Sequence, residues 1–179
     1  MILYILKKHD ESSLIDLLMI LQTLQNLSDF KTPASRLLGL DVGSKTIGLA
    51  LSDTQWMIAS PFKTIFRTKF TQDVKELKKV FEEFKISGLV VGLPVNMDGR
   101  EGPRCQSVRQ FARNLQPHCH IPLCFWDERT STMAVTRTLL DADVSRKRRA
   151  EIVDKMAASF ILQGALDSLR NSLLKSLDQ

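Results

Sequence analysis

Short apolar runs separated by a few turn-forming residues dominate the chain between residues 37 and 66. Such runs are typical of β-strands, and the pattern predicts strands over 37–42, 46–52 and 62–66. The connections between them leave no room for a crossover helix. We therefore expect these three strands to pair antiparallel.

Beyond residue 70 the apolar positions recur at helical spacing, and further short apolar runs lie between these helical stretches. Strands separated by helices are expected to join the same sheet in parallel. The pattern predicts helices over 71–85, 103–115, 130–140 and from about 149 to 173, and strands over 88–93 and 121–126. The fold class is therefore mixed α/β.

Residues 1–36 form a separate segment ahead of a domain that spans 37–179. Its leucines recur at helical spacing from Leu14 to Leu27, and residues 32–35 are typical of a linker. We expect a helical N-terminal extension that either docks on the domain or pairs with a second subunit, so a homodimer is one option. The acidic residues and the late start of the apolar run disfavour a targeting segment.

Composition narrows the class of protein. The chain has 179 residues, 44% of them hydrophobic, which suits one domain of ordinary size. No apolar run approaches the ~20 residues of a membrane span, so we expect no membrane partner. The formal charge of +5 permits nucleic acid as a partner. The three cysteines form no Cys-x-x-Cys pair, which favours a reducing compartment, and we expect a cytoplasmic protein.

Acidic residues from three distant segments are expected to converge at one edge of the sheet. Asp41 lies in an apolar strand, where an unpartnered carboxylate would be costly to desolvate. Asp127 and Glu128 follow the strand 121–126 at its carboxyl end, where open α/β sheets place ligands. Asp154 lies early on the last predicted helix. Carboxylates gathered in this way repel one another unless hard cations such as Mg²⁺ or Mn²⁺ offset their charge.

Each acidic residue also has an ordinary interpretation. Asp154 could be a solvated helix residue, Asp127 or Glu128 a helix cap, and Asp41 a turn former before Gly43. What favours a shared site is that all of them agree in their placement on the predicted fold.

The segment from Gly39 to Thr46 nearly matches the phosphate-binding loop of nucleotide-binding proteins, but Ser44 stands where that loop needs its second glycine. That loop must also lead into a helix, whereas residues 46–52 have the pattern of a strand. We therefore expect a β-hairpin at 43–45.

These residues carry a family resemblance. The chain resembles the YqgF (RuvX) family of bacterial RNase H-like nucleases from residue 37 to about 167, and residues 1–36 lie outside the resemblance. The motifs that carry it are Gly-Leu-Asp-Val-Gly-Ser-Lys-Thr-Ile-Gly-Leu-Ala (39–50), Val-Val-Gly-Leu-Pro-Val-Asn-Met-Asp-Gly (90–99), Gly-Pro-Arg (102–104), Asp-Glu-Arg-Thr-Ser-Thr (127–132), and Val-Asp-Lys-Met-Ala-Ala (153–158) followed by Ile-Leu-Gln (161–163).

The resemblance implies an RNase H-like fold, a five-stranded sheet with three antiparallel and two parallel strands flanked by helices. It also implies catalytic carboxylates at Asp41, Glu128 and Asp154 that bind divalent metal, Mg²⁺ or Mn²⁺. Asp127 is a further candidate, and the sequence leaves open which of Asp127 and Glu128 is the main ligand. Hydrolysis of a phosphodiester with two such ions needs no histidine base.

Two nuclease activities are associated with this family. One is processing of the 5′ end of precursor 16S rRNA, which we favour, and the other is resolution of Holliday junctions in four-way DNA. A third reading is a non-catalytic RNA-binding factor in ribosome assembly, which the presence of all three acidic residues disfavours. An ATPase of the actin and sugar-kinase type would need a second domain for which the chain has no room.

Basic residues near the predicted site are candidates for contacts to nucleic-acid phosphates. The run at 146–149 could equally be a solvated entry to the last helix. Aromatic residues are scarce, at 7% of the chain, which favours recognition of backbone and shape over sequence. The candidates are Lys45, Arg100, Arg104, Arg129, Arg146, Lys147, Arg148 and Arg149.

Overall fold

The computed structural model describes residues 19–130 and 146–177. Its centre is a six-stranded mixed sheet with the strand order β1-β6-β5-β2-β3-β4. The strands are β1 (Ile20–Leu21), β2 (Arg36–Val42), β3 (Thr46–Ser52), β4 (Ala59–Phe66), β5 (Ile86–Leu93) and β6 (Leu123–Asp127). β2, β3 and β4 pair antiparallel, whereas β5 and β6 extend the sheet from β2 in parallel and β1 adds a short parallel edge.

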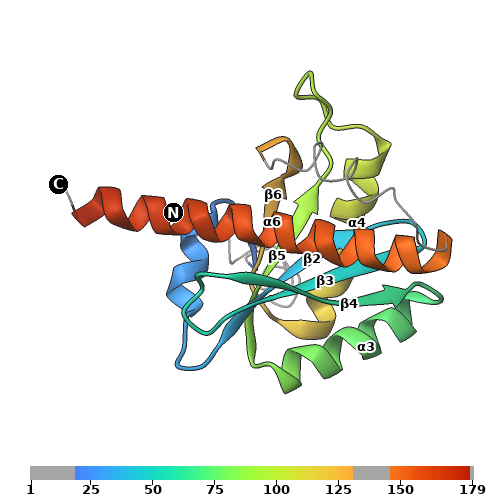
Figure 1. Cartoon of the computed structure of the whole chain (residues 1–179), viewed down its shortest axis with the longest axis horizontal. Helices are drawn as coiled ribbons and strands as arrows, with labels where there is room; N and C mark the ends of the chain where they lie inside the picture. Colours follow the sequence, from blue (N-terminus) through green and yellow to red (C-terminus); the bar gives the residue numbers. More distant parts are fainter. Residues whose placement is uncertain (1–18, 131–145, 178–179) are drawn as a thin grey trace, which may run out of the picture.

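Helices cover both faces of this sheet. α3 (Phe70–Glu83) and α4 (Pro103–Cys119) pack on one face, and the long helix α6 (Arg146–Leu177) crosses the other (Figure 1). Two 3₁₀ helices, η1 (Leu24–Phe30) and η2 (Glu128–Thr130), follow β1 and β6. None of the helices in the described ranges is long and apolar enough to cross a membrane.

Alternation along β2 shows how one strand serves both layers. Leu38 and Leu40 are fully buried in the cluster formed with α3 and α4, whereas Leu37 is fully buried in the cluster formed with α6. Gly39 shares the side of Leu37, because a Cβ there would lie 2.7 Å from the Cβ of Leu162 on α6. By the same two-residue period, Asp41 points to the α6 face.

The predicted mixed α/β sheet of RNase H-like type is confirmed, with its three antiparallel and two parallel strands. The predicted count of five strands is wrong by one, because the short strand β1 adds a sixth strand at the edge of β6. The β-hairpin at 43–45 is confirmed as well, because the Gly43 N–H donates to the Thr46 carbonyl at 2.9 Å and strand β3 follows. The segment is therefore not a phosphate-binding loop, which would lead into a helix.

Several predicted bounds shift. β4 begins at Ala59, before the predicted 62, and α6 spans Arg146–Leu177, longer than the predicted 149–173. α4 continues beyond the predicted 115, through Pro117 to Cys119. Its last turn is held by Gln116, whose buried side-chain amide donates to the Ile121 carbonyl at 3.1 Å. Apart from residue 130 in η2, the predicted helix 130–140 lies outside the described residues.

The predicted amphipathic helix at the N-terminus is wrong for the part that the structure describes, and residues 1–18 lie outside it. Ile20 and Leu21 form β1 beside Leu123 and Cys124, and the Leu123 N–H donates to the Met19 carbonyl at 2.7 Å. The free edge of β6 offers unpaired backbone groups, and satisfying them favours a strand over a helix here. The described part of the segment thus docks on its own sheet. Docking on the domain was one of the two predicted options.

The 3₁₀ helix η1 buries its apolar side chains in the α6 face of the core. Leu24 and Leu27 lie in the same cluster as Ala158, Leu162 and Leu166 of α6. Leu27 is fully buried and packs so closely over β5 that a Cβ at Gly88 would lie 2.9 Å from its Cδ2 atom. Residues ahead of the predicted domain boundary therefore form part of the core.

We predict that Leu27→Ala lowers the free energy of unfolding by about 2–5 kcal/mol, the usual cost of emptying a fully buried leucine site. Urea denaturation of the full-length chain measures this change. Leu174→Ala on α6 is the matched control, because Leu174 is 55% exposed and its loss should cost no more than about 0.5 kcal/mol. Equal destabilisation by both variants would show that η1 adds nothing to the core.

Candidate active site

Asp41 lies on β2 between two glycines of the neighbouring strands. It pairs with Gly48 of β3, and the β2–β5 register ends at Leu40 and Val91, one residue before Asp41 and Gly92. Because all three strands direct these positions to the α6 face, Asp41 is flanked on both sides by residues without side chains. Other parts of the chain can therefore approach the sheet closely next to this carboxylate.

Gly48 allows the backbone of α6 to approach the sheet at Asp154. A Cβ at Gly48 would overlap the carbonyl oxygen and carbon of Asp154. The helix thus crosses β3 at the residue that pairs with Asp41, which brings the backbone of Asp154 next to the strand that carries Asp41. The Asp154 Oδ2 atom is buried and has no hydrogen-bond partner among the described residues. A buried carboxylate oxygen in that state is costly unless another group satisfies it.

Gly92 provides the space for Glu128. A Cβ at Gly92 would lie 2.6 Å from the Glu128 Oε1 atom and would overlap Ile161 of α6. Glu128 begins η2 directly after β6, and its carboxylate reaches over β5 on the α6 face. Asp41, Glu128 and Asp154 therefore lie on the same face of the sheet, around three adjacent strands.

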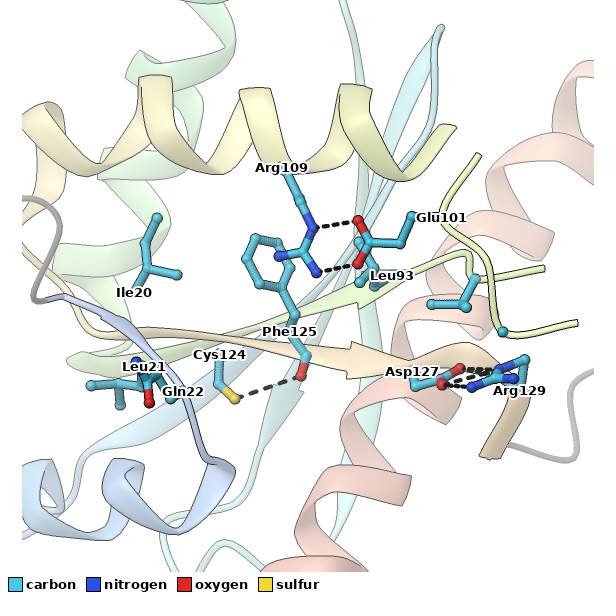
Figure 2. A pocket seen from close by; sticks show the side chains of 12 residues that line it. Ile20, Leu21, Gln22, Leu93, Glu101, Arg109, Cys124, Phe125, Asp127 and Arg129 are labelled. Carbon is cyan, nitrogen blue, oxygen red and sulfur yellow. Dashed lines mark hydrogen bonds and ion pairs between the residues drawn. The ribbon is translucent and has the colours of Figure 1, made fainter. Parts of the chain in front are cut away.

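Asp127 faces the opposite side. Leu123 and Phe125 pack in the cluster formed with α3 and α4, and the two-residue period places Asp127 on that face as well. Its carboxylate accepts hydrogen bonds from Arg129, with 2.6 Å between Oδ2 and Nη2 (Figure 2). These bonds hold the pKa of Asp127 below its ordinary value. The geometry thus separates Asp127 from Asp41 and Asp154 and favours Glu128 as their partner.

A cavity of about 530 Å³ lies on the Asp127 side, between β1, β6 and the loop that follows β5. Arg109 of α4 projects into it, and its Nε and Nη2 atoms donate to the Glu101 carboxylate (Figure 2). The guanidinium carbon of Arg109 lies 4.7 Å from the centre of the Phe125 ring. Arg129 and Asp127 form the second ion pair at its wall. The cavity includes none of Asp41, Glu128 and Asp154, so it is a separate space from the carboxylate group.

The described basic candidates all follow the carboxyl ends of the parallel strands. Lys45 lies in the turn after β2, Arg100 and Arg104 follow β5, and Arg129 follows β6. Carboxyl ends of parallel strands meet at one edge of a sheet. Arg100 binds Asp98 at 3.0 Å and Arg129 binds Asp127, whereas Lys45 and Arg104 are exposed. The side chains of the run 146–149, at the start of α6, lie outside the described residues.

The loop after β5 turns at Gly99 and lies beside Arg129 at this edge of the sheet. The Gly99 N–H donates to the Asn96 carbonyl at 2.9 Å, and Gly99 has a φ of +84°, a backbone conformation that suits glycine. A Cβ at Gly99 would lie 3.6 Å from the Nη1 atom of Arg129, so the loop tip adjoins the residue after the acidic pair. Pro103 opens α4 after Gly102, where its missing N–H costs nothing.

The family model for RuvX, described as Holliday junction resolvase, matches residues 35–168. The chain belongs to the RuvX family. A relative from Paramagnetospirillum magneticum is 68% identical over 133 residues, which are 74% of this chain and 86% of the relative. A relative from Zymomonas mobilis is 62% identical over 133 residues, 74% of this chain and 81% of the relative. Both carry the name "Putative pre-16S rRNA nuclease".

Among solved structures, Thermus thermophilus RuvC in complex with a Holliday junction substrate is similar with a TM-score of 0.48 and 9% identity. The match covers 75% of this chain and 94% of RuvC. The RuvX membership, which rests on sequence, confirms the predicted class of enzyme, a nuclease that hydrolyses ester bonds, and nucleic acid as its partner.

The carboxylates of this RuvX chain fit a divalent cation by their chemistry. Carboxylate oxygens are the donors that Mg²⁺ and Mn²⁺ prefer, and the buried Asp154 Oδ2 atom has no hydrogen-bond partner among the described residues. In residues 19–130 and 146–177, however, no three His, Cys, Asp or Glu side chains stand close enough together to hold an ion. The donors lie on one face without forming a closed set of ligands.

Reasoning from the sequence missed the role of Gly48 and Gly92 in this RuvX site. The signal was present, because a glycine inside a strand often marks the close approach of another backbone or group. What the sequence did not show is which groups approach. The structure identifies them as the backbone of Asp154 and the carboxylate of Glu128.

We predict that Gly92→Ala lowers the nuclease activity of each folded molecule about tenfold or more, because the new methyl group displaces the Glu128 carboxylate. Gly88→Ala is the matched control on the same strand and face. Its Cβ would crowd Leu37 and Leu27, far along the strand from the carboxylates. Both variants should lose stability in urea, but only Gly92→Ala should lose specific activity. A similar specific activity for the two variants would show that Gly92 has no particular role in the site.

Proposed function

We propose that the protein is a divalent-metal-dependent nuclease that processes the 5′ end of precursor 16S rRNA in the cytoplasm. The observation that carries the proposal is the placement of Asp41, Glu128 and Asp154 around Gly48 and Gly92 on one face of the sheet. The names of the RuvX relatives support the substrate, because a protein 68% identical to this chain is named for precursor 16S rRNA.

In this proposal Asp41, Glu128 and Asp154 hold the metal, most simply two Mg²⁺ or Mn²⁺ ions. When bound, such ions supply an activated water and stabilise the negative charge that builds on the phosphate and the leaving oxygen. The protein contributes the fixed placement of the three carboxylates. The central sheet holds Asp41, and α6 and η2 bring the other two to it from distant parts of the chain.

The substrate backbone would lie along the edge where the parallel strands end. Lys45 and Arg104 are exposed there, and Arg100 and Arg129 add two guanidinium groups that carboxylates of the protein hold in place. Arg146, Lys147, Arg148 and Arg149 lie at the start of α6, eight to five residues before Asp154. Contacts of this kind bind phosphates and position the nucleic acid without recognising its bases.

Resolution of Holliday junctions is the second candidate function, because the RuvX family model is described by that activity. Both functions need the same hydrolysis of a phosphodiester and differ in the shape of the nucleic acid. A non-catalytic role in ribosome assembly is disfavoured, because it gives no reason to bring three carboxylates to one face of the sheet.

We predict that the purified protein with Mg²⁺ or Mn²⁺ cuts a 5′-extended precursor of small-subunit rRNA faster than a four-way DNA junction. Asp41→Asn should lower this rate about 100-fold or more, because an isosteric amide removes a charge that acts at the reacting phosphate. Chelation with EDTA should abolish cutting, and added Mg²⁺ should restore it. Faster cutting of the junction would favour the resolvase, and no cutting of either above the Asp41→Asn background would refute the nuclease.

We further predict different outcomes for the two adjacent acidic residues. Glu128→Gln should lower kcat about 100-fold or more, whereas Asp127→Asn should keep kcat within about tenfold of wild type. The reason is that Asp127 lies on the other face and binds Arg129, so its loss changes the orientation of Arg129 and raises KM. The two variants are matched, because each replaces a carboxylate by an amide of the same shape. The reverse order of kcat values would make Asp127 the ligand.

A further inference from the structure

Asp73 is the only charged residue among the buried side chains that the structure describes, at 2% exposed. It lies in the first turn of α3, where the positive end of the helix favours an anion. Its Oδ1 atom accepts a hydrogen bond from the Thr68 N–H at 3.2 Å, and its Oδ2 atom accepts one from the Arg67 Nε at 3.4 Å. A buried charge with these partners is costly to leave alone, so Arg67 is fixed from this side.

Arg67 uses its remaining donors on the turn after Asp41. Its Nη1 atom donates to the Gly43 carbonyl at 2.7 Å, and its backbone N–H donates to the Lys45 carbonyl at 2.9 Å. The guanidinium lies 5.3 Å from the centre of the Phe111 ring on α4. One residue therefore connects both helices of the α3/α4 face to both ends of the turn at 43–45.

The bond to Gly43 completes the turn. The Gly43 N–H already donates to the Thr46 carbonyl, so the polar groups of this residue are held on two sides. Gly43 follows Asp41 by two residues, and Lys45, an exposed candidate for a phosphate contact, closes the turn. The hydrogen bonds of Asp73 at the start of α3 do not require the bond from Arg67 to Gly43, which points to a role of Arg67 beyond the stability of the helix.

We propose that Arg67 is a positioning residue of the active site, which fixes the turn that follows Asp41 and carries Lys45. This inference rests on the proposed nuclease function. Arg67 itself does not contact the substrate, and it acts through the Gly43 and Lys45 carbonyls. A lysine could not replace it, because a single ammonium group cannot serve Asp73 and Gly43 with the fixed fork of a guanidinium.

The test compares Arg67→Lys with Lys63→Met. The matched control removes a nearby exposed ion pair to the same helix, since Lys63 of β4 binds Glu76 of α3 at 2.9 Å. Amide hydrogen exchange of residues 43–46 is the readout that needs no activity. Exchange there should be faster in Arg67→Lys and unchanged in Lys63→Met. Unchanged exchange in both variants would overturn the inference.

The kinetic readout is measured per folded molecule. Arg67→Lys should lower kcat/KM about tenfold, while Lys63→Met should stay within about twofold of wild type. Lys45→Ala and the double variant then complete a cycle. If Arg67 acts through the turn that carries Lys45, the double variant should lose less than the product of the two single losses. Losses that simply multiply would leave Arg67 as a residue of general stability.

Two outcomes need separate treatment. Should Arg67→Lys fail to fold, Asp73→Asn keeps the arginine but weakens its anchor, and the same two readouts apply with smaller changes expected. An inactive wild-type protein would refute the proposed function, and hydrogen exchange at 43–46 would still decide whether Arg67 holds the turn. The failures of the two proposals are therefore distinguishable.

Discussion

The close approach of α6 to the central sheet is the constraint on which the rest of the structure depends. The helix meets β2 at Gly39 and β3 at Gly48, where a side chain would overlap Ala158, Leu162 or the backbone of Asp154. Glycine inside a strand costs roughly 0.5–1 kcal/mol relative to alanine. The chain accepts this cost at several positions on one face, and in return a helix residue far along the sequence comes to lie beside Asp41.

Three arginine ion pairs and one carboxylate oxygen without a hydrogen-bond partner among the described residues show how the chain treats its acidic side chains differently. On the α3/α4 face three carboxylates have arginine partners: Asp73 binds Arg67, Glu101 binds Arg109 and Asp127 binds Arg129. Each of these pairs is complete within the protein. On the α6 face the buried Asp154 Oδ2 atom has no hydrogen-bond partner in the described parts of the chain. The three arginine pairs thus neutralise their carboxylates within the protein, whereas the Asp154 Oδ2 atom is buried without a described hydrogen-bond donor.

Much of this could be predicted from the sequence, because the controlling signals are local. The short apolar runs and the turn at 43–45 predicted the antiparallel strands, and their spacing from the helices predicted the parallel ones. The choice between Asp127 and Glu128 could not be predicted, because it depends on the last residue of β6. The predicted strand ended at 126, whereas β6 includes Asp127, and that residue therefore takes the face of Phe125. Strand ends vary by a residue or two, and each such shift reverses the face of a side chain.

The N-terminal segment shows a different limit. Its leucines have helical spacing, yet Ile20 and Leu21 form a strand and Leu24 to Phe30 a 3₁₀ helix, because the edge of β6 and the surface of α6 are available only in the folded molecule. This segment precedes the RuvX match, which begins at residue 35. It pairs with β6 at Leu123 and Cys124, a few residues before Glu128, and its β1 residues line the cavity on the Asp127 side. Its influence on the site is therefore indirect and takes two routes. It holds β6, from which η2 directs Glu128 over Gly92, and it packs Leu24 and Leu27 against α6, the helix that carries Asp154.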